Sequence, residues 1–275
     1  MKNLLFLLFP FLVFAQTHRF VYEFQYKLDS LSQDFGRENM ILDINPSEVK
    51  FYPYAYAVLD SLNILRGQRD SRWDDHLPAI IRKRESNENT SLVLLNDLFA
   101  LKSLDKLDWK LYPETKAEGV YTLQKATAHF GGRNWIAWFS KEVAISEGPY
   151  KFRGLPGLIF EIGDDKNNFI FKLIKSRKFP KTYATPFLDS FLGKKPILVS
   201  EKIIVKKTLE IYHDPLHDIA ESFKSNTSPD QTFYVYGTQI KSLDQLKTLA
   251  DESRERIRKN NNPIEIHKAI QYPIK

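Results

Sequence analysis

Two histidines in the segment HDPLHD have a spacing that could serve a metal ion. His213 and His217 lie four positions apart, which would place both imidazoles on one helix face, and Asp214 and Asp218 would add oxygen ligands. Pro215 disturbs this geometry, because a helix that begins there leaves His213 outside it. No third ligand follows at a convincing spacing, so we expect no metal site.

Carboxylates near the middle of the chain are the next candidates for chemistry. Glu161, Asp164 and Asp165 would have to supply the acid and base of a glycan hydrolase. Two of them fall in a predicted turn, where acidic residues are ordinarily solvated. The sequence has no Gly-x-Ser-x-Gly, no HExxH and no phosphate-binding glycine motif. We therefore expect no catalytic residues and no cofactor.

Aromatic and basic side chains alternate with glycines between Glu118 and Asp164. The turn at Pro156 and Gly157 is expected to be of type II, with a positive φ at the glycine. This segment is either a loop that presents basic side chains to a ligand or a buried corner between strands, and the buried corner is favoured because the turn holds only apolar and turn-forming residues. The candidate binding residues are Arg133, Trp135, Trp138, Tyr150, Lys151 and Arg153.

Alternating apolar residues predict the strands that must position these side chains. Large apolar groups recur at every second position from Phe20 to Leu28, and Trp135 and Trp138 fall on opposite faces of another strand. A polar turn over 163–168 predicts a hairpin. Further strands are expected over residues 91–95, 107–112, 119–130, 134–140, 157–163, 168–177 and 203–211.

Two segments have helical rather than alternating spacing. Residues 54–66 carry apolar groups three and four positions apart, and residues 243–259 follow a capping box formed by Ser242 and Gln245. Residues 66–90 are dense in charge and predict a surface excursion. We expect a mainly β or α+β fold with one curved antiparallel sheet, a half-barrel of the lipoprotein-carrier or lipocalin-like kind that wraps a helix, together with a C-terminal helix and one or two further helices.

The N-terminus predicts export. Lys2 precedes an apolar run over residues 4–14, which is typical of a signal peptide and shorter than the roughly 20 residues of a membrane span. We expect residues 1–15 to be removed and residues 16–275 to form one β-rich domain without a transmembrane segment. The expected location is the periplasm, with secretion or the cell surface as alternatives.

The chain has no cysteine, so no disulfide or thiolate site can form. Its net charge of +6 comes without a nucleic-acid-binding motif, so no nucleic acid is expected as a partner.

Several motifs occur in an order that resembles the GLPGLI family of exported bacterial envelope proteins. The resemblance is strongest over residues 107–175, and the family has no assigned biochemical role. Leu123 stands where members often have a cysteine. The matching landmarks are Trp109, Glu114-Thr115, Gln124 to Thr127, Gly132 to Trp138, Gly148 to Phe152, Gly154 to Ile159 and Asn261 to Glu265.

These observations favour a non-catalytic envelope protein. Its expected ligand is an apolar or lipid-like amphipathic molecule, or an outer-membrane or envelope partner protein, bound at a concave or edge surface. Two alternatives stay open: a hydrolase acting on glycan or peptidoglycan through a carboxylate pair, and a structural or assembly factor with an apolar patch but no cavity.

Overall fold

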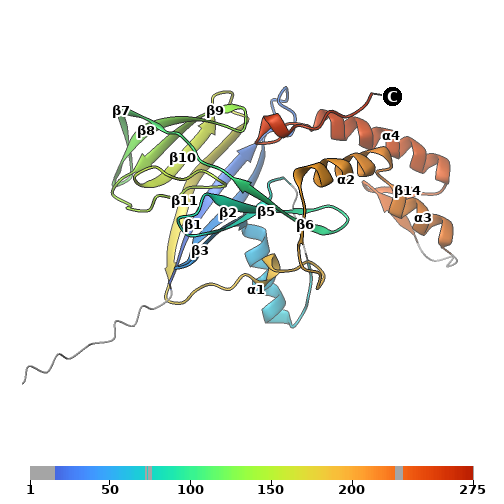
Figure 1. The fold of residues 1–275 in the computed structure, drawn as a ribbon. Coiled ribbons are helices and arrows are strands. Elements are labelled where there is room, and N and C mark those ends of the chain that lie inside the picture. Colours follow the sequence, from blue (N-terminus) through green and yellow to red (C-terminus); the bar gives the residue numbers. More distant parts are fainter. Residues whose placement is uncertain (1–15, 72, 74–75, 227–231, 275) are drawn as a thin grey trace, which may run out of the picture.

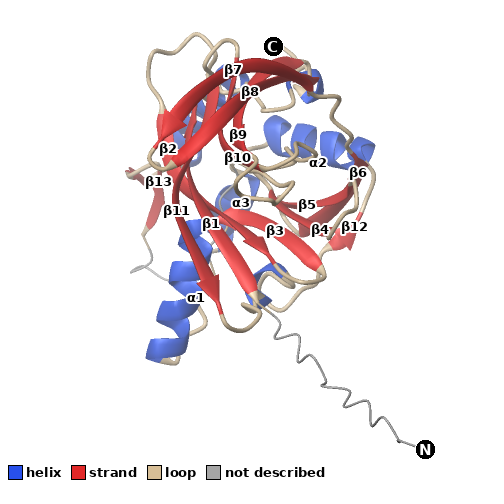
Figure 2. Cartoon of the chain, turned by 90° about the vertical axis from the view of Figure 1, so that its left-hand side faces the viewer, coloured by secondary structure: helices blue, strands red, loops and turns tan. Residues whose placement is uncertain are grey.

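The computed structural model describes residues 16–71, 73, 76–226 and 232–274, so the predicted signal peptide lies outside the described part. A large curved sheet of twelve strands dominates it, in the order β12-β6-β5-β4-β3-β2-β1-β11-β10-β9-β8-β7 (Figures 1 and 2). The strands are β1 (Thr17–Tyr26), β2 (Gly36–Ile44), β3 (Glu48–Pro53), β4 (Ala79–Lys83), β5 (Glu88–Leu94), β6 (Leu98–Leu104), β7 (Lys110–Glu118), β8 (Tyr121–Phe130), β9 (Arg133–Ser140), β10 (Leu158–Asp164), β11 (Phe169–Phe179) and β12 (Ile197–Leu198).

The predicted mainly β half-barrel is therefore confirmed. Neighbouring strands pair antiparallel except at one edge, where the two-residue strand β12 runs parallel to β6. The hairpin predicted over 163–168 joins β10 to β11, with Glu161 opposite Lys172. The strand expected over 107–112 begins only at Lys110.

The aromatic alternation of β1 forms the inner face of the curve. Tyr22 and Phe24 are fully buried, and the Tyr22 hydroxyl donates a 2.6 Å hydrogen bond to the carbonyl of Ile159 on β10. β1 pairs with β2 on one side and with β11 on the other, and a bulge between Val21 and Tyr22 interrupts the β11 register. Bulges bend a strand and increase its twist, which suits a sheet that curls around a core.

An irregular segment fills the concavity instead of the expected helix. Residues 141–157, which we call the interior segment, place Tyr150, Phe152 and Leu155 in the same apolar cluster as the inner faces of β1 to β3 and β8 to β11. The Phe152 ring lies 4.5 Å from Trp135 and 6.4 Å from Phe171. The helix α1 (Tyr54–Arg66) was predicted with the correct bounds, but it packs outside the curve against a second cluster that includes Tyr52 (Figure 2).

The segment expected as a strand over 203–211 is a helix, α2 (Glu201–His213). Alternate positions had suggested a strand, but the less exposed residues recur at helical spacing: Ile204, Val205, Thr208, Leu209, Ile211 and Tyr212. That prediction was wrong because several apolar residues in succession fit both periods. Ser200 precedes the helix and Glu201 lies in its first turn, which suits the helix dipole.

A smaller helical unit follows the sheet (Figure 1). It comprises α2, α3 (His217–Ser225), the hairpin of β13 (Phe233–Val235) and β14 (Thr238–Ile240), and α4 (Leu243–Lys259). Leu216, Val235, Ile240, Leu246 and Ala250 form its apolar cluster. The predicted C-terminal helix and its cap are confirmed, because the Ser242 hydroxyl accepts a 3.2 Å hydrogen bond from the backbone N–H of Gln245.

The expectation of a surface excursion over 66–90 was wrong in its second half. Leu77 and Ile80 are buried, and β4 pairs with both β3 and β5 inside the large sheet. The charged residues of this segment obscured the pattern, since even Arg82 points inward and is buried. Residues 72, 74 and 75 of the segment lie outside the described part.

Candidate functional site

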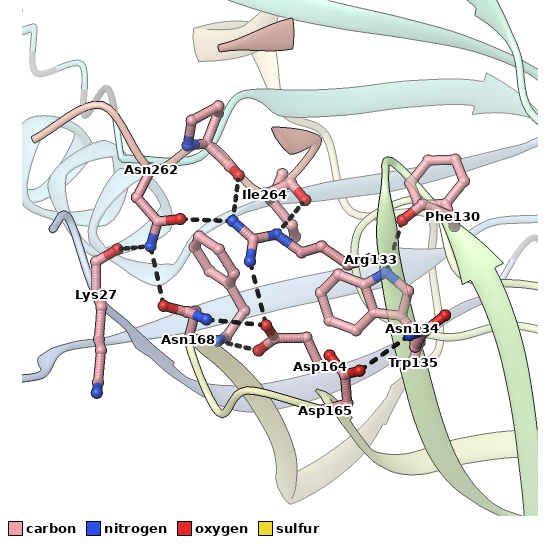
Figure 3. Close-up of polar contacts among 12 residues, drawn as sticks. Lys27, Phe130, Arg133, Asn134, Trp135, Asp164, Asp165, Asn168, Asn262 and Ile264 are labelled. Carbon is pink, nitrogen blue, oxygen red and sulfur yellow. Dashed lines mark hydrogen bonds and ion pairs between the residues drawn. The ribbon is translucent and has the colours of Figure 1, made fainter. Parts of the chain in front are cut away.

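Arg133, a predicted binding residue, holds the C-terminal part of the chain in place (Figure 3). Its buried guanidinium donates hydrogen bonds to the carbonyls of Ile264 (3.0 Å) and Pro263 (2.9 Å) and to Oδ1 of Asn262 (2.6 Å). It also contacts the carboxylate of Asp164 at 3.2 Å. Burial lowers the pKa of Arg133, and Asp164 opposes that effect. We call residues 260–268 the C-terminal strap; Arg133 is one of its anchors.

Tyr150 and Lys151 form a second anchor of the C-terminal strap. The Tyr150 hydroxyl donates a 2.6 Å hydrogen bond to Glu265 Oε1, and Lys151 Nζ lies 2.8 Å from the same oxygen. Lys268 contacts the other carboxylate oxygen at 2.8 Å, and Lys151 also reaches Asp105 at 3.3 Å. Burial raises the pKa of Tyr150, and the negative charge of Glu265 adds to this. Neither Tyr150 nor Lys151 is available to an external ligand, because both are buried and engaged.

Arg153 links the interior segment to the far side of the sheet. One guanidinium nitrogen donates to the carbonyl of Ser86 (2.9 Å) and to Asn87 Oδ1 (2.8 Å), in the turn between β4 and β5. Arg153 and Arg82 both approach the buried carboxylate of Glu147. The pKa of Arg82 is lowered to about 9 by burial and by the neighbouring charge of Arg153. Through the interior segment, which joins β9 to β10, these contacts tie that side of the unclosed sheet to β4 and β5 on the other side.

The turn expected to be of type II is built differently. Gly154 has a positive φ of 99°, whereas Gly157 does not have a positive φ. Gly157 is required by close packing instead, because a Cβ there would lie 2.0 Å from the carbonyl oxygen of Ser140. Trp109 closes this corner, with its indole N–H donating a 2.8 Å hydrogen bond to the carbonyl of Arg153. The favoured interpretation, a buried corner between two strands, agrees with this geometry.

The two tryptophans lie on opposite faces of β9, as the alternation predicted. Trp135 is fully buried in the interior, and its indole N–H donates to the carbonyl of Phe130 at 3.0 Å. Trp138 is half-buried on the other face, where Lys116 Nζ lies 4.7 Å from its ring centre. The structure does not bring Trp138 together with Tyr150 or Arg153 in one cavity.

The histidine pair spans a break between two helices. His213 ends α2 and His217 begins α3, so the two imidazoles do not share a helix face. The exposed His217 ring lies 2.9 Å from Asp214, three residues earlier. Within the described ranges, no group of three metal-ligating side chains is found.

The three candidate carboxylates are each engaged. Glu161 lies 2.6 Å from Lys116, and Asp165 accepts a 2.9 Å hydrogen bond from the amide of Asn134. Asp164 binds Arg133 and accepts a 2.8 Å hydrogen bond from the backbone N–H of Phe169. Their contacts are structural ones, made within the turn and to the neighbouring strands.

An open groove remains at one end of the concave face, and it is the candidate binding site. Its volume is about 750 Å³, within the roughly 300–1,000 Å³ of small-molecule sites. It lies among β1, β10, β11, the β7–β8 turn and the start of the interior segment. The apolar residues lining it are Phe20, Val120, Tyr121, Val143, Ala144, Ile145, Leu158, Phe160, Leu173 and Ile174. Its polar lining consists of His18, Glu118, Glu142, Lys175, Ser176 and Lys178, with Gly119 at the turn.

The register explains how β1 and β11 contribute to this groove. Phe20 lies opposite Ser176, and His18 lies opposite Lys178, so these four side chains share the inner face beyond the bulge. On β10, Phe160 lies two positions from the inward-facing Ile162 and packs beside Tyr121, with ring centres 5.0 Å apart.

None of the six residues predicted as a binding surface lines this groove. Sequence reasoning identified the alternation that contains Phe20, but it placed the binding surface around β9 and the interior segment. The buried corner was the favoured interpretation of the central motif, but the partners that bury Arg133 and Tyr150 lie more than 100 positions away in the chain.

Comparison with known proteins gives a short family match and a likeness of fold. Residues 131–161 match the family described as "Protein of unknown function (Porph_ging)". No curated protein matches the chain. Two structures of PNGF-II, in space groups C2 and P21, are similar with TM-scores of 0.50 and 0.49 and identities of 15% and 13%. Each match covers 70% of this chain and 32% or 33% of PNGF-II, so the chain spans about a third of that protein. At this identity the C2 structure supports the fold alone.

No helix in the described part of the chain is both long and apolar enough to cross a membrane.

Proposed function

We propose that this protein is a non-catalytic binding protein that takes an amphipathic ligand into the open groove. The observation that carries the proposal is the groove itself: a concave region of about 750 Å³ with an apolar floor and charged walls. Elsewhere in the concavity the interior segment and the C-terminal strap occupy the space. Ligand sites of this kind are typically apolar with a few polar groups that fix orientation.

The groove favours ligand binding over the purely structural role. An assembly factor would be expected to present an apolar patch without a cavity. Here three apolar residues of the groove are only half-buried, although they pack against the main cluster: Tyr121, Val143 and Leu173. A bound ligand could cover their exposed surface. Covering such surface stabilises a complex by about 25 cal/mol for each Å² removed from water.

The resemblance to the GLPGLI family is part of this proposal. The ordered motifs and the short match over residues 131–161 support it. Membership would fit an exported protein of the periplasm or cell surface, with residues 1–15 as its signal peptide. Mass spectrometry of the mature N-terminus in a native host would test export, because an uncleaved Met1 would contradict it.

Fluorescence of an uncharged apolar probe, N-phenyl-1-naphthylamine, tests the binding function. We expect a saturable increase when the probe is added to the purified chain. Val143→Glu should remove it, because a charge would then lie in the half-buried floor of the groove. Leu104→Glu is the matched control, since Leu104 is 80% exposed and lies outside the groove. No binding by the parent chain, or equal loss in both variants with unchanged melting temperatures, would refute the proposal.

A further inference from the structure

We infer that the groove selects an anionic amphiphile, with its negative head group beside Lys178 and His18 and its alkyl chain on the apolar floor. This inference rests on the proposed binding function and specifies the ligand class for the same site. It follows from where charge lies along the groove and from which charged groups already have partners.

Basic and apolar side chains follow one another on the inner face of β1 and β11. Lys178 lies opposite His18, and the next inward pair is Ser176 opposite Phe20. The His18 and Phe20 rings are 4.2 Å apart, so the basic end of the groove adjoins its apolar floor directly. Leu173 continues that floor toward the bulge. A single alkyl chain with one charged end matches this order of side chains.

The acidic groups of the groove lie on other segments than β1 and β11 and have contacts of their own. Glu118 lies 3.7 Å from Lys172, and the Glu142 carboxylate accepts a 2.8 Å hydrogen bond from the backbone N–H of Thr122. By contrast, no carboxylate of the described residues lies within ion-pair distance of Lys178 or Lys175. An incoming anion therefore meets a positive end without a competing internal partner.

His18 adds a donor to this end. Burial lowers the pKa of His18, and the charge of Lys178 lowers it further. Near neutral pH the ring is then mostly uncharged and offers one N–H, while Lys178 supplies the positive charge. A cationic head group would meet repulsion from Lys178, and a neutral head group would gain nothing from it.

Competition among three amphiphiles of the same chain length tests the inference. Dodecanoate, dodecyl maltoside and dodecyltrimethylammonium would each displace N-phenyl-1-naphthylamine, below their micelle concentrations and at one ionic strength. We expect dodecanoate to displace the probe at the lowest concentration, about threefold below the others, as suits an exposed charge pair. Equal potency, or preference for the cation, would overturn the inference.

A charge-matched pair of variants locates the effect. Lys178→Gln should weaken dodecanoate binding about threefold and leave binding of the uncharged probe unchanged. Arg177→Gln removes the same charge from the adjacent residue, which lies opposite Arg19 on the outer face of β11, and should change neither. Equal weakening of dodecanoate binding by both variants would mean that the protein's net charge, not Lys178, causes the preference for the anion, and it would overturn the assignment. Absence of probe binding to the parent chain would instead refute the proposed function, so the two failures are distinguishable.

Discussion

Replacing Glu265 with glutamine should destabilise the protein in a strongly pH-dependent way. Burial alone would raise the pKa of this carboxyl group, but Lys151, Lys268 and Tyr150 together lower it from 4.5 to about 2. At about 1.4 kcal/mol for each pH unit, that lowering corresponds to roughly 3 kcal/mol. A carboxyl group whose folded-state pKa is depressed contributes stability above its unfolded-state value and loses it as pH falls through its folded-state value. The contribution of Glu265 should therefore be complete near pH 7 and disappear between about pH 4.5 and about pH 2.

Urea unfolding of the parent chain and of Glu265→Gln, followed by circular dichroism, measures this contribution. We expect the variant to be less stable by about 3 kcal/mol near neutral pH, with the difference shrinking as the pH falls toward about 2. Glu252→Gln, at an exposed position of α4, is the control and should change the free energy of unfolding little at neutral or at acidic pH. A Glu265→Gln difference that stays constant with pH would refute the reasoning, because the ionised carboxylate would then contribute nothing beyond its shape.

Two further substitutions test the packing of the interior and of the C-terminal strap. Arg133→Lys keeps the charge but cannot reproduce the hydrogen bonds to Asn262, Pro263 and Ile264, so it should lower the free energy of unfolding by about 2–4 kcal/mol. Arg177→Lys on the outer face of β11 is the control. Equal small losses of stability in both variants would contradict the anchoring role of Arg133. Gly157→Ala should cost about 3 kcal/mol, because its Cβ would lie 2.0 Å from the Ser140 carbonyl oxygen. Gly163→Ala has its nearest contact at 3.3 Å and should cost clearly less, and a thermal melt that ranks the two in the opposite order would count against the close packing.

Local patterns predicted the sheet well because each depends on near neighbours in the chain. The alternation in β1, the turn before β11 and the cap of α4 are fixed by residues within a few positions of one another. Helix α2 was mistaken for a strand where successive apolar residues satisfied both periods. Strand β4 was missed because its inward residue Arg82 is charged, and its ion-pair partner Glu147 lies far along the chain in the interior segment.

The contents of the concavity depend on contacts that sequence spacing does not encode. Arg133 meets Asn262 across 129 positions, and Tyr150 meets Glu265 across 115. Without these partners, basic and aromatic side chains in the central motif resembled a binding surface. The β11 residues that line the groove were not identified because a bulge there, with Ile174 left unpaired opposite β1, shifts which side chains face inward.

Blocking the groove with a covalent label tests the central claim most directly. The chain has no cysteine, so Ser176→Cys places a single thiol on the inner face of β11, and Arg177→Cys places one on the outer face beside it. After reaction with a bulky maleimide, the Ser176→Cys protein should no longer bind N-phenyl-1-naphthylamine, whereas the labelled Arg177→Cys protein should bind it as the parent does. Unchanged binding by labelled Ser176→Cys would contradict the assignment of the groove as the binding site.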